Sequence, residues 1–139
     1  MRIRKIREED LRVLAALNAE IFNDNTEEQT LVTFKDAWGR KIGNACLVAE
    51  ENQEIIGAII IEKKVTFLKK SSGITSFFVK KEWQGKGIGR KLMESALAVL
   101  KESGYKNVSL TVELDNEKAV SLYEKEGFKP FRMLYLKEL

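Results

Sequence analysis

Gln84-Gly85-Lys86-Gly87-Ile88-Gly89-Arg90 decides the fold, because it lies where a strand feeds into a helix. The preceding residues, 74–79, form a β-branched and aromatic stretch that is typical of a buried strand. From Ile88 onward, apolar residues recur with the period of a helix. Glycines lack Cβ atoms, so they let the backbone approach a ligand closely, and the free N–H groups of a helix start favour an anion. The stretch therefore predicts a cradle for a pyrophosphate, with a flexible glycine turn as the alternative.

The spacing of the glycines separates the possible phosphate ligands. In the dinucleotide pattern G-x-G-x-x-G, counted from Gly85, the third glycine would fall on Arg90, and the loop of nucleotide triphosphatases does not match either. The stretch resembles Q/R-x-x-G-x-G/A, the acyl-CoA loop of the GNAT superfamily of N-acetyltransferases. Gln84, Gly87 and Gly89 occupy its defined positions.

A second motif strengthens this resemblance. Residues 116–128, Asn-Glu-Lys-Ala-Val-Ser-Leu-Tyr-Glu-Lys-Glu-Gly-Phe, are similar to the GNAT signature N-x-x-A-x-x-L-Y-x-x-x-G-F. They follow the glycine stretch by a helix and a strand, as they do in that family. The resemblance covers about residues 74–131. It implies a mixed α/β fold whose mostly antiparallel sheet has helices on both faces and is splayed between its fourth and fifth strands. Acyl-CoA would lie in that gap.

Composition sets limits on the class of protein. A length of 139 residues suits a single domain, 1–139, and 44% hydrophobic and 32% charged residues are those of a folded globular chain. No apolar run approaches the ~18–20 residues that span a bilayer, and no secretory leader is evident, so we expect a cytoplasmic protein without a membrane partner. The net charge of +3 is too small to favour a nucleic-acid partner.

The sequence offers few residues for metal binding or for thiol chemistry. The chain has no histidine and one cysteine, Cys46, which lies in an apolar strand-like run and is expected in the core. We therefore expect no metal. Lysine pairs at 63–64, 69–70 and 80–81 are interpreted as solvated surface, although one of them could meet the 3′-phosphate of CoA.

Periodicity and capping residues predict the remaining elements. A helix with an apolar face begins near Leu11 and breaks at 23–25, and Thr26 with Gln29 forms a capping box that opens a second helix. Asn116 is a good N-cap for a short helix. Gly57 indicates a bulge or a close backbone contact. Strands are expected at residues 2–6, 44–49, 55–62, 74–79 and 108–113, with a closing strand or hairpin at 131–136.

The resemblance implies specific cofactor contacts. Backbone groups of residues 77–79 would bind the pantetheine arm and thioester, and amides of residues 85–90 would bind the pyrophosphate. The Asn116 side chain would also contact the cofactor, and Tyr123 would protonate the departing CoA thiolate. Helix capping by Asn116 and simple packing of the Tyr123 ring are the alternatives. The implied cofactor-binding set is Phe77, Phe78, Val79, Gln84, Gly85, Lys86, Gly87, Ile88, Gly89, Arg90, Asn116 and Tyr123.

The general base is the weakest part of the implied site. Family members place a glutamate on the fifth strand, where this chain has Thr111, or on the fourth, where it has Thr75 and Ser76. Strand alternation would place Glu113 on the same face as Thr111, so Glu113 is the preferred candidate. Asp115 and Glu62 are further candidates, and a water chain or an already neutral amine would serve instead.

The resemblance implies an enzyme that transfers the acetyl group of acetyl-CoA to a primary amine by direct attack. The acceptor would be a small amine, a peptide N-terminus or a lysine, and the sequence does not choose among them. A non-catalytic acyl-CoA-binding or interaction domain is the alternative, because the expected base is missing. Family analogy also suggests a homodimer.

Overall fold

The computed structural model describes residues 1–22, 26–65 and 68–139, and in them one sheet with strand order β1-β2-β3-β4-β5. Its first four strands pair antiparallel, whereas β4 and β5 run parallel. The strands are β1 (Arg2–Lys5), β2 (Leu47–Glu51), β3 (Glu54–Lys64), β4 (Ser71–Val79) and β5 (Asn107–Ser109). This is the mixed, mostly antiparallel α/β architecture that the sequence predicts.

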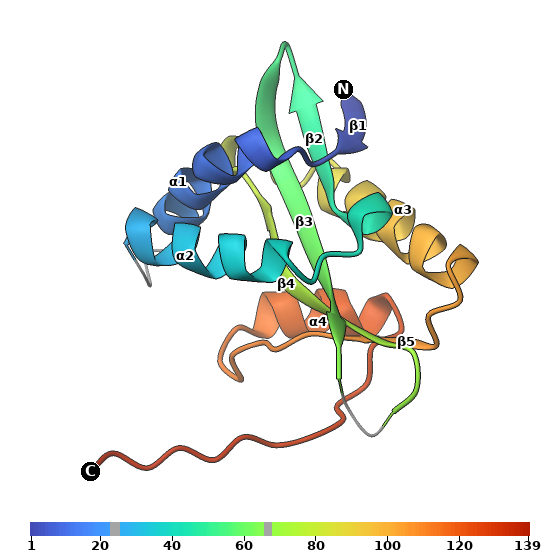
Figure 1. The fold of residues 1–139 in the computed structure, drawn as a ribbon. Helices are drawn as coiled ribbons and strands as arrows, with labels where there is room; N and C mark the ends of the chain where they lie inside the picture. Colours follow the sequence, from blue (N-terminus) through green and yellow to red (C-terminus); the bar gives the residue numbers. More distant parts are fainter. Residues whose placement is uncertain (23–25, 66–67) are drawn as a thin grey trace.

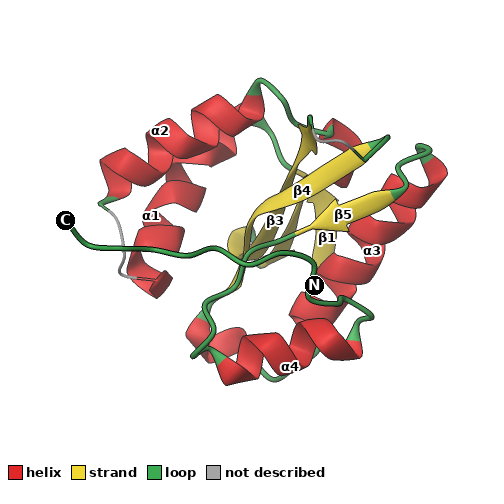
Figure 2. Cartoon of the chain, turned by 90° about the horizontal axis from the view of Figure 1, so that it is seen from below, coloured by secondary structure: helices red, strands yellow, loops and turns green. Residues whose placement is uncertain are grey.

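Helices cover both faces of the sheet (Figures 1 and 2). The helices α1 (Leu11–Phe22) and α2 (Glu27–Trp38) lie on one face, and α3 (Ile88–Glu102) lies on the other. The short helix α4 (Glu117–Lys125) follows β5 in the chain. Its Tyr123, and Phe128 just after the helix, pack against the hydrophobic cluster that contains the buried residues of α3. The strong amphipathicity of α3 explains its position, because its buried residues form one stripe: Ile88, Leu92, Met93, Ala96 and Leu100.

Strand alternation divides the core into two clusters. Along β3, Ala58 and Ile60 face α1 and α2, whereas Ile59 and Ile61 face α3. Period-two alternation thus buries both faces of β3, and its residues 55–62 are all buried. Cys46 belongs to the first cluster and is fully buried, as the sequence predicts.

Two register shifts interrupt the pairing of the central strands. One falls between Ala49 and Glu50 of β2, beside Gly57. A Cβ at Gly57 would lie 3.0 Å from the Phe78 carbonyl oxygen, so the close backbone contact expected from the sequence is confirmed. In the second shift, Ile60 pairs with residue 76 and Ile61 with residue 74, which leaves Thr75 of β4 as the extra, bulged residue.

Local capping signals are confirmed where the structure describes them. The Thr26 hydroxyl accepts a bond from the Gln29 amide (3.1 Å), and the Gln29 side chain accepts one from the Thr26 amide (2.9 Å). The expected break at 23–25 lies outside the described residues. The second strand begins later than predicted, at Leu47, because residues 43–45 form a short 3₁₀ turn.

Two strand predictions near the C-terminus are wrong. The fifth strand ends at Ser109 instead of continuing to Glu113, and no strand forms at 131–136. A strand forms by pairing with a neighbouring strand, and among the described residues no strand pairs with residues 110–113 or 131–136. The large apolar residues of the C-terminal segment are correspondingly exposed: Phe131, Met133, Leu134, Tyr135, Leu136 and Leu139.

An ion-pair network anchors β1 to the start of α1. The Arg4 guanidinium donates to both carboxylate oxygens of Asp10, at 2.8 and 3.1 Å, and to Glu50 at 3.0 Å. The Arg7 amide also donates to Asp10, at 2.8 Å. Burial by itself raises the pKa of Asp10, but the bonds from Arg4 and Arg7 outweigh it and lower the pKa below its usual value.

We expect Asp10→Asn to lower the free energy of unfolding at pH 7 by about 2 kcal/mol, because Arg4 loses its bidentate partner. A carboxylate with a lowered native pKa stabilises fully above its unfolded pKa of ~3.9, and this stability is lost as pH falls through the native pKa. Urea unfolding should therefore show a gap between variant and wild type that closes in acid. Asp36→Asn, at an exposed ion pair with Arg40, is the matched control and should leave stability unchanged. A gap that stays constant down to pH 2 would contradict this account.

Candidate functional site

The glycine loop lies between the end of β4 and the start of α3. Gly85 and Gly87 have φ angles of +79° and +82°, in the left-handed region that side chains rarely adopt. A Cβ at either position would meet no atom within 4 Å, so the reason for glycine here is backbone conformation and not crowding. Gly87 is the N-cap of α3, and no side chain caps the helix, so the first-turn amides remain available to an anion.

Two side chains shape this loop from within. The Gln84 carboxamide donates to the Val79 carbonyl (2.9 Å) and so ties the loop to the end of β4. The Lys86 ammonium lies 4.8 Å from the centroid of the Trp83 ring, a cation–π contact. Gly89 is crowded, unlike Gly85 and Gly87, since a Cβ there would lie 3.3 Å from the Phe77 ring. The start of α3 thus packs directly against the C-terminal end of β4, at Phe77 and Val79.

One edge of β4 is largely open. Its pairing with β5 covers only residues 71–73, whereas its pairing with β3 continues to Val79. The backbone groups of residues 74–79 that point away from β3 therefore have no partner strand in the described part of the chain. This opening is the splay predicted between the fourth and fifth strands, and it leads from the glycine loop toward the middle of β4.

Tyr123 of α4 projects to the same region. Its ring is half-buried, 6.4 Å from the Phe77 ring and 5.8 Å from the Phe128 ring, between centroids. No described residue donates to or accepts from its hydroxyl group. Burial raises the pKa of Tyr123 above 10, so the phenol remains protonated at neutral pH. Contacts to two aromatic rings also support the packing role that the sequence leaves open.

Asn116 and Glu113 lie on the segment between β5 and α4. The Asn116 side chain accepts a bond from the Ala119 amide (3.2 Å), which confirms its role as N-cap. Glu113 and Thr111 are exposed, and neither belongs to a strand. The alternation argument that aligned Glu113 with Thr111 therefore does not apply here, and the role of Glu113 as base stays a prediction.

A buried carboxylate lies on the other face of the sheet. Glu62 of β3 is 5% exposed and accepts a bond from the bulged Thr75 (3.1 Å), with Lys64 at 2.9 Å and Arg40 at 3.4 Å. Sequence reasoning named Glu62 as a base candidate but missed Lys64 and Arg40. No sequence signal connects Arg40 with a strand residue 22 positions away.

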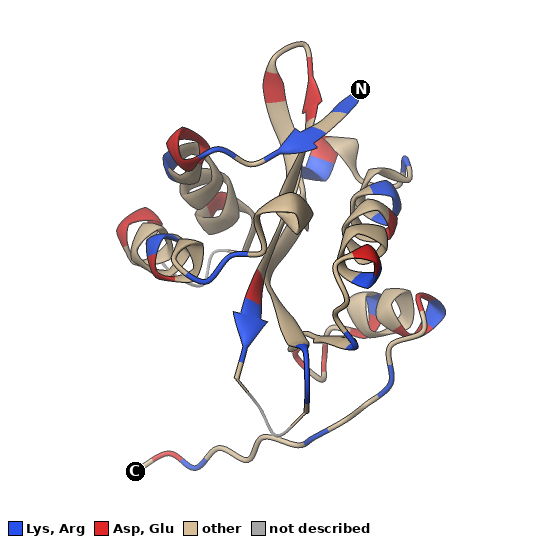
Figure 3. Ribbon diagram, turned by 45° about the vertical axis from the view of Figure 1, so that its right-hand side comes forward, with Lys and Arg blue, Asp and Glu red and all other residues tan. Residues whose placement is uncertain are grey.

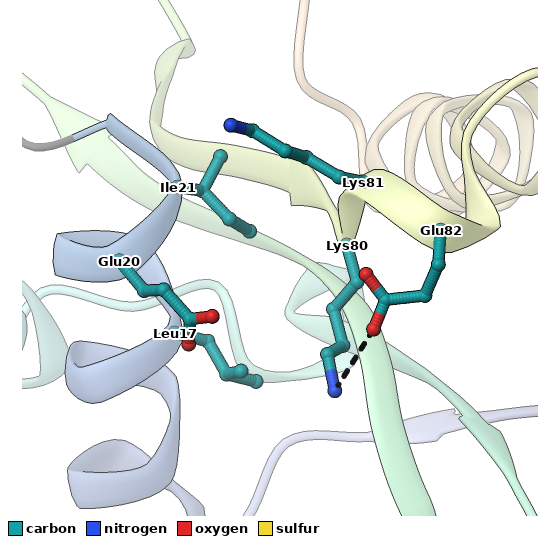
Figure 4. Close-up of a pocket in the computed structure, with 6 residues that line it drawn as sticks. All are labelled: Leu17, Glu20, Ile21, Lys80, Lys81 and Glu82. Atoms are coloured by element: carbon teal, nitrogen blue, oxygen red, sulfur yellow. Dashed lines mark ion pairs between the residues drawn. The ribbon is translucent and has the colours of Figure 1, made fainter.

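The lysine pairs take different positions (Figure 3). Residues 63–64 and 69–70 lie at the end of β3 and β4 that is far from the glycine loop, whereas Lys80 and Lys81 lie beside it. The Lys80 ammonium is held by Glu54 (2.6 Å) and Glu82 (3.6 Å). Figure 4 shows the pocket at this point, which is lined by Leu17, Glu20 and Ile21 of α1 and by Lys80, Lys81 and Glu82 just after β4.

Thiol, metal and membrane features add nothing to this site. Burial raises the pKa of the Cys46 thiol, which favours its inert, protonated form. Within residues 1–22, 26–65 and 68–139, no group of acidic, histidine or cysteine side chains could hold a metal ion. No helix of the described chain is long and apolar enough to cross a membrane.

A splayed α/β sheet with a glycine-lined helix start at the gap defines the acyltransferase class of fold. The model of the acetyltransferase (GNAT) family matches residues 11–128, and the chain belongs to this family.

Three known proteins show the range of similarity. The N-alpha-acetyltransferase 30 of Schizosaccharomyces pombe is 38% identical over 89 residues, which cover 63% of this chain and 59% of that protein. The structure of PH1933 from Pyrococcus horikoshii is 28% identical, with a TM-score of 0.79, and covers 96% and 92% of the two chains. A GNAT family acetyltransferase from Brucella melitensis in complex with acetyl-CoA is 25% identical, with a TM-score of 0.73, and covers 93% and 82%. The chain thus spans about three fifths of the length of its fission-yeast relative.

Proposed function

We propose that this protein is an acetyl-CoA-dependent N-acetyltransferase that acts on a primary amine. The observation that carries the proposal is the pair of left-handed glycines, Gly85 and Gly87, at an uncapped helix start beside the open edge of β4. The Brucella structure, which holds acetyl-CoA, and the N-alpha-acetyltransferase of fission yeast support the choice of cosubstrate and reaction.

The glycine loop and the open edge of β4 would bind different parts of acetyl-CoA. Amides of residues 85–90 would hold the pyrophosphate, where the dipole of α3 favours negative charge. Backbone groups of residues 77–79 would bond the pantetheine arm and polarise the thioester carbonyl, as donors in an oxyanion hole do. Gln84 would act by holding the loop to Val79, and Asn116 by fixing the start of α4.

Acetyl transfer then requires two proton movements. The amine nitrogen bonds to the thioester carbonyl carbon, the carbon–sulfur bond breaks, and the amine loses one proton while the thiolate gains one. Tyr123 would supply the proton to sulfur, because its half-buried phenol remains protonated at neutral pH. Deprotonating an alkyl amine with a pKa of ~10.4 costs about 4.6 kcal/mol at pH 7, against about 1.4 kcal/mol for an α-amine near ~8. A base therefore matters most for alkyl amines.

Turnover distinguishes an enzyme from a protein that only binds acyl-CoA. Acetyl-CoA is incubated with a panel of alkyl amines, lysine and short peptides, and release of free thiol is measured. Thiol release that depends on one class of amine supports the proposal. Tight acetyl-CoA binding with no amine-dependent release would favour the non-catalytic alternative, which the lack of a carboxylate at Thr75, Ser76 and Thr111 keeps open.

Cytoplasmic location and a homodimer are further proposals. Cell fractionation tests the first, and light scattering coupled to gel filtration tests the second.

Gly87→Ala should weaken acetyl-CoA binding by about tenfold or more. Alanine disfavours the left-handed φ of Gly87, so the loop amides would move out of position. A hydrogen bond from one such amide to a charged phosphate is worth about 1.5–3 kcal/mol. Isothermal titration calorimetry measures this. Gly104→Ala is a matched control: Gly104 also has a left-handed φ, +87°, and open space around it, but it lies at the far end of α3. Both variants should lose similar stability, and only the first should lose affinity. Equal affinity in the two would remove the glycine loop from cosubstrate binding.

Tyr123→Phe should lower kcat by about 10²–10⁴-fold with little change in acetyl-CoA affinity, since it keeps the ring and removes the acidic proton. Steady-state kinetics under conditions where chemistry limits the rate provide the measurement. Tyr135→Phe, at a tyrosine that is 82% exposed, is the control and should behave as wild type. Near wild-type kcat in Tyr123→Phe would leave Tyr123 with its packing role alone.

Glu113→Gln tests the base. If Glu113 accepts the amine proton, the acidic limb of the kcat/KM profile for an alkyl amine should shift or disappear in the variant. Asp115→Asn, at the neighbouring exposed carboxylate, provides the comparison. Profiles of Glu113→Gln and wild type that superimpose would exclude Glu113.

A further inference from the structure

The bulge at Thr75 decides which face of the sheet the last residues of β4 occupy. Ile74 and Phe77 both pack against the hydrophobic cluster that contains the buried residues of α3, here called the α3 cluster. They are three residues apart, so strict alternation would place them on opposite faces. Because Thr75 is an extra residue opposite β3, alternation resumes one residue later. The bulge therefore brings Phe77 to the face on which Tyr123 packs.

The same shift selects the backbone groups that β4 presents at its open edge. In an antiparallel pair, residues whose N–H and C=O groups bond the neighbouring strand alternate with residues whose groups point away from it. β4 pairs with β3 as far as Val79, so beyond the bulge every second residue directs its backbone groups to the gap. A slip of one residue would exchange these groups for those of the adjacent residues.

Apolar burial by itself specifies this register only weakly. Phe77, Phe78 and Val79 are all apolar, so a slip of one residue would exchange the faces of similar side chains. Hydrophobic clusters cover both faces, and each already receives a phenylalanine ring from β4. A further feature must therefore hold the bulge at Thr75.

Two side-chain hydrogen bonds hold consecutive residues at the bulge. The Thr75 hydroxyl donates to the Glu62 carboxylate of β3 (3.1 Å), and the Asn18 carboxamide of α1 donates to the Ser76 hydroxyl (2.9 Å). Ser76 is 8% exposed. A slip that removed the bulge would turn Ser76 toward the apolar α3 cluster and away from Asn18. Burying a hydroxyl group without a partner is costly, so the two bonds favour the bulged register.

The two bonds differ in charge. Burial by itself raises the pKa of Glu62, but the bond and charge of Lys64, with Thr75 and Arg40, outweigh it and lower the pKa. Glu62 is thus an ionised acceptor at neutral pH, and its replacement would also disturb two cations. The bond between Asn18 and Ser76 joins neutral groups, so it can be removed without leaving a buried charge.

We propose that Asn18 and Ser76 are positioning residues, which fix the register of β4 together with Thr75 and Glu62. The fixed register would present the backbone of residues 77–79 to the pantetheine arm of acetyl-CoA. Asn18 acts through Ser76 from the α1 side of the sheet and contacts no part of the cosubstrate itself. The inference rests on the proposed acetyl-CoA-dependent function.

Binding of acetyl-CoA and of its nucleotide half tests this role. 3′-Phospho-ADP carries a pyrophosphate for the glycine loop but lacks the pantetheine arm, so its affinity should not depend on the register of β4. Isothermal titration calorimetry measures both ligands with wild type, Asn18→Ala and Ser76→Ala. Each variant should bind acetyl-CoA about tenfold or more weakly and bind 3′-phospho-ADP as wild type does. Because the two residues share one bond, the double variant should lose no more affinity than either single variant.

Thr30→Val is the matched control. It removes another buried hydroxyl, which donates to the Thr26 carbonyl within α2 at 3.0 Å, and it should leave the ratio of the two affinities unchanged. Equal losses for both ligands in Asn18→Ala and Ser76→Ala, or no loss for either, would overturn the positioning role.

The titration needs no turnover, so it separates this inference from the proposed function. A wild-type protein that binds acetyl-CoA but acetylates no amine would contradict the proposed enzyme, while the selective loss in Asn18→Ala and Ser76→Ala would still support the positioning role. A wild-type protein that binds 3′-phospho-ADP and acetyl-CoA equally well would overturn the inference, because the pantetheine arm would then gain nothing from β4.

Discussion

The rest of the structure depends on a parallel pairing of only three residues between β4 and β5. Residues 71–73 pair with 107–109, and the buried Ser72 hydroxyl donates to the Asn107 carbonyl at 2.8 Å. Beyond this short contact the two strands separate, so residues 74–79 of β4 keep an open edge. A longer pairing would satisfy those backbone groups within the sheet and leave none for a ligand.

The open edge is positioned by packing on both faces of the sheet. On one face, Gly89 allows α3 to approach Phe77, and this places the uncapped start of the helix at the end of the gap. On the other face, the bulge at Thr75 interrupts the pairing of β4 with β3 and directs a hydroxyl to Glu62. The gap is therefore bordered on the α3 side by the half-buried ring of Tyr123, which lies 6.4 Å from the Phe77 ring between centroids.

Charge in this protein is arranged for different purposes in different places. Arg4 and Asp10 lie at the edge of the sheet, and both are largely buried, which makes their pair a structural link between β1 and α1. At Glu62 only the anion is buried, and its cations are half-exposed. The two sites therefore differ in exposure: both charges are buried at Arg4 and Asp10, whereas solvent reaches the cations at Glu62.

The sequence by itself determined the parts that depend on neighbours along the chain. The glycine loop, the capping box at Thr26, the N-cap at Asn116 and the apolar stripe of α3 all follow from residues a few positions apart. Only the tertiary structure decided where β5 ends and that residues 131–136 are not a strand, because a strand forms only where a partner satisfies its backbone. Likewise, the meeting of Glu62 with Thr75 and Arg40, and of Tyr123 with Phe77, joins residues distant in sequence. Such contacts are set by register and packing, which no local pattern of residues records.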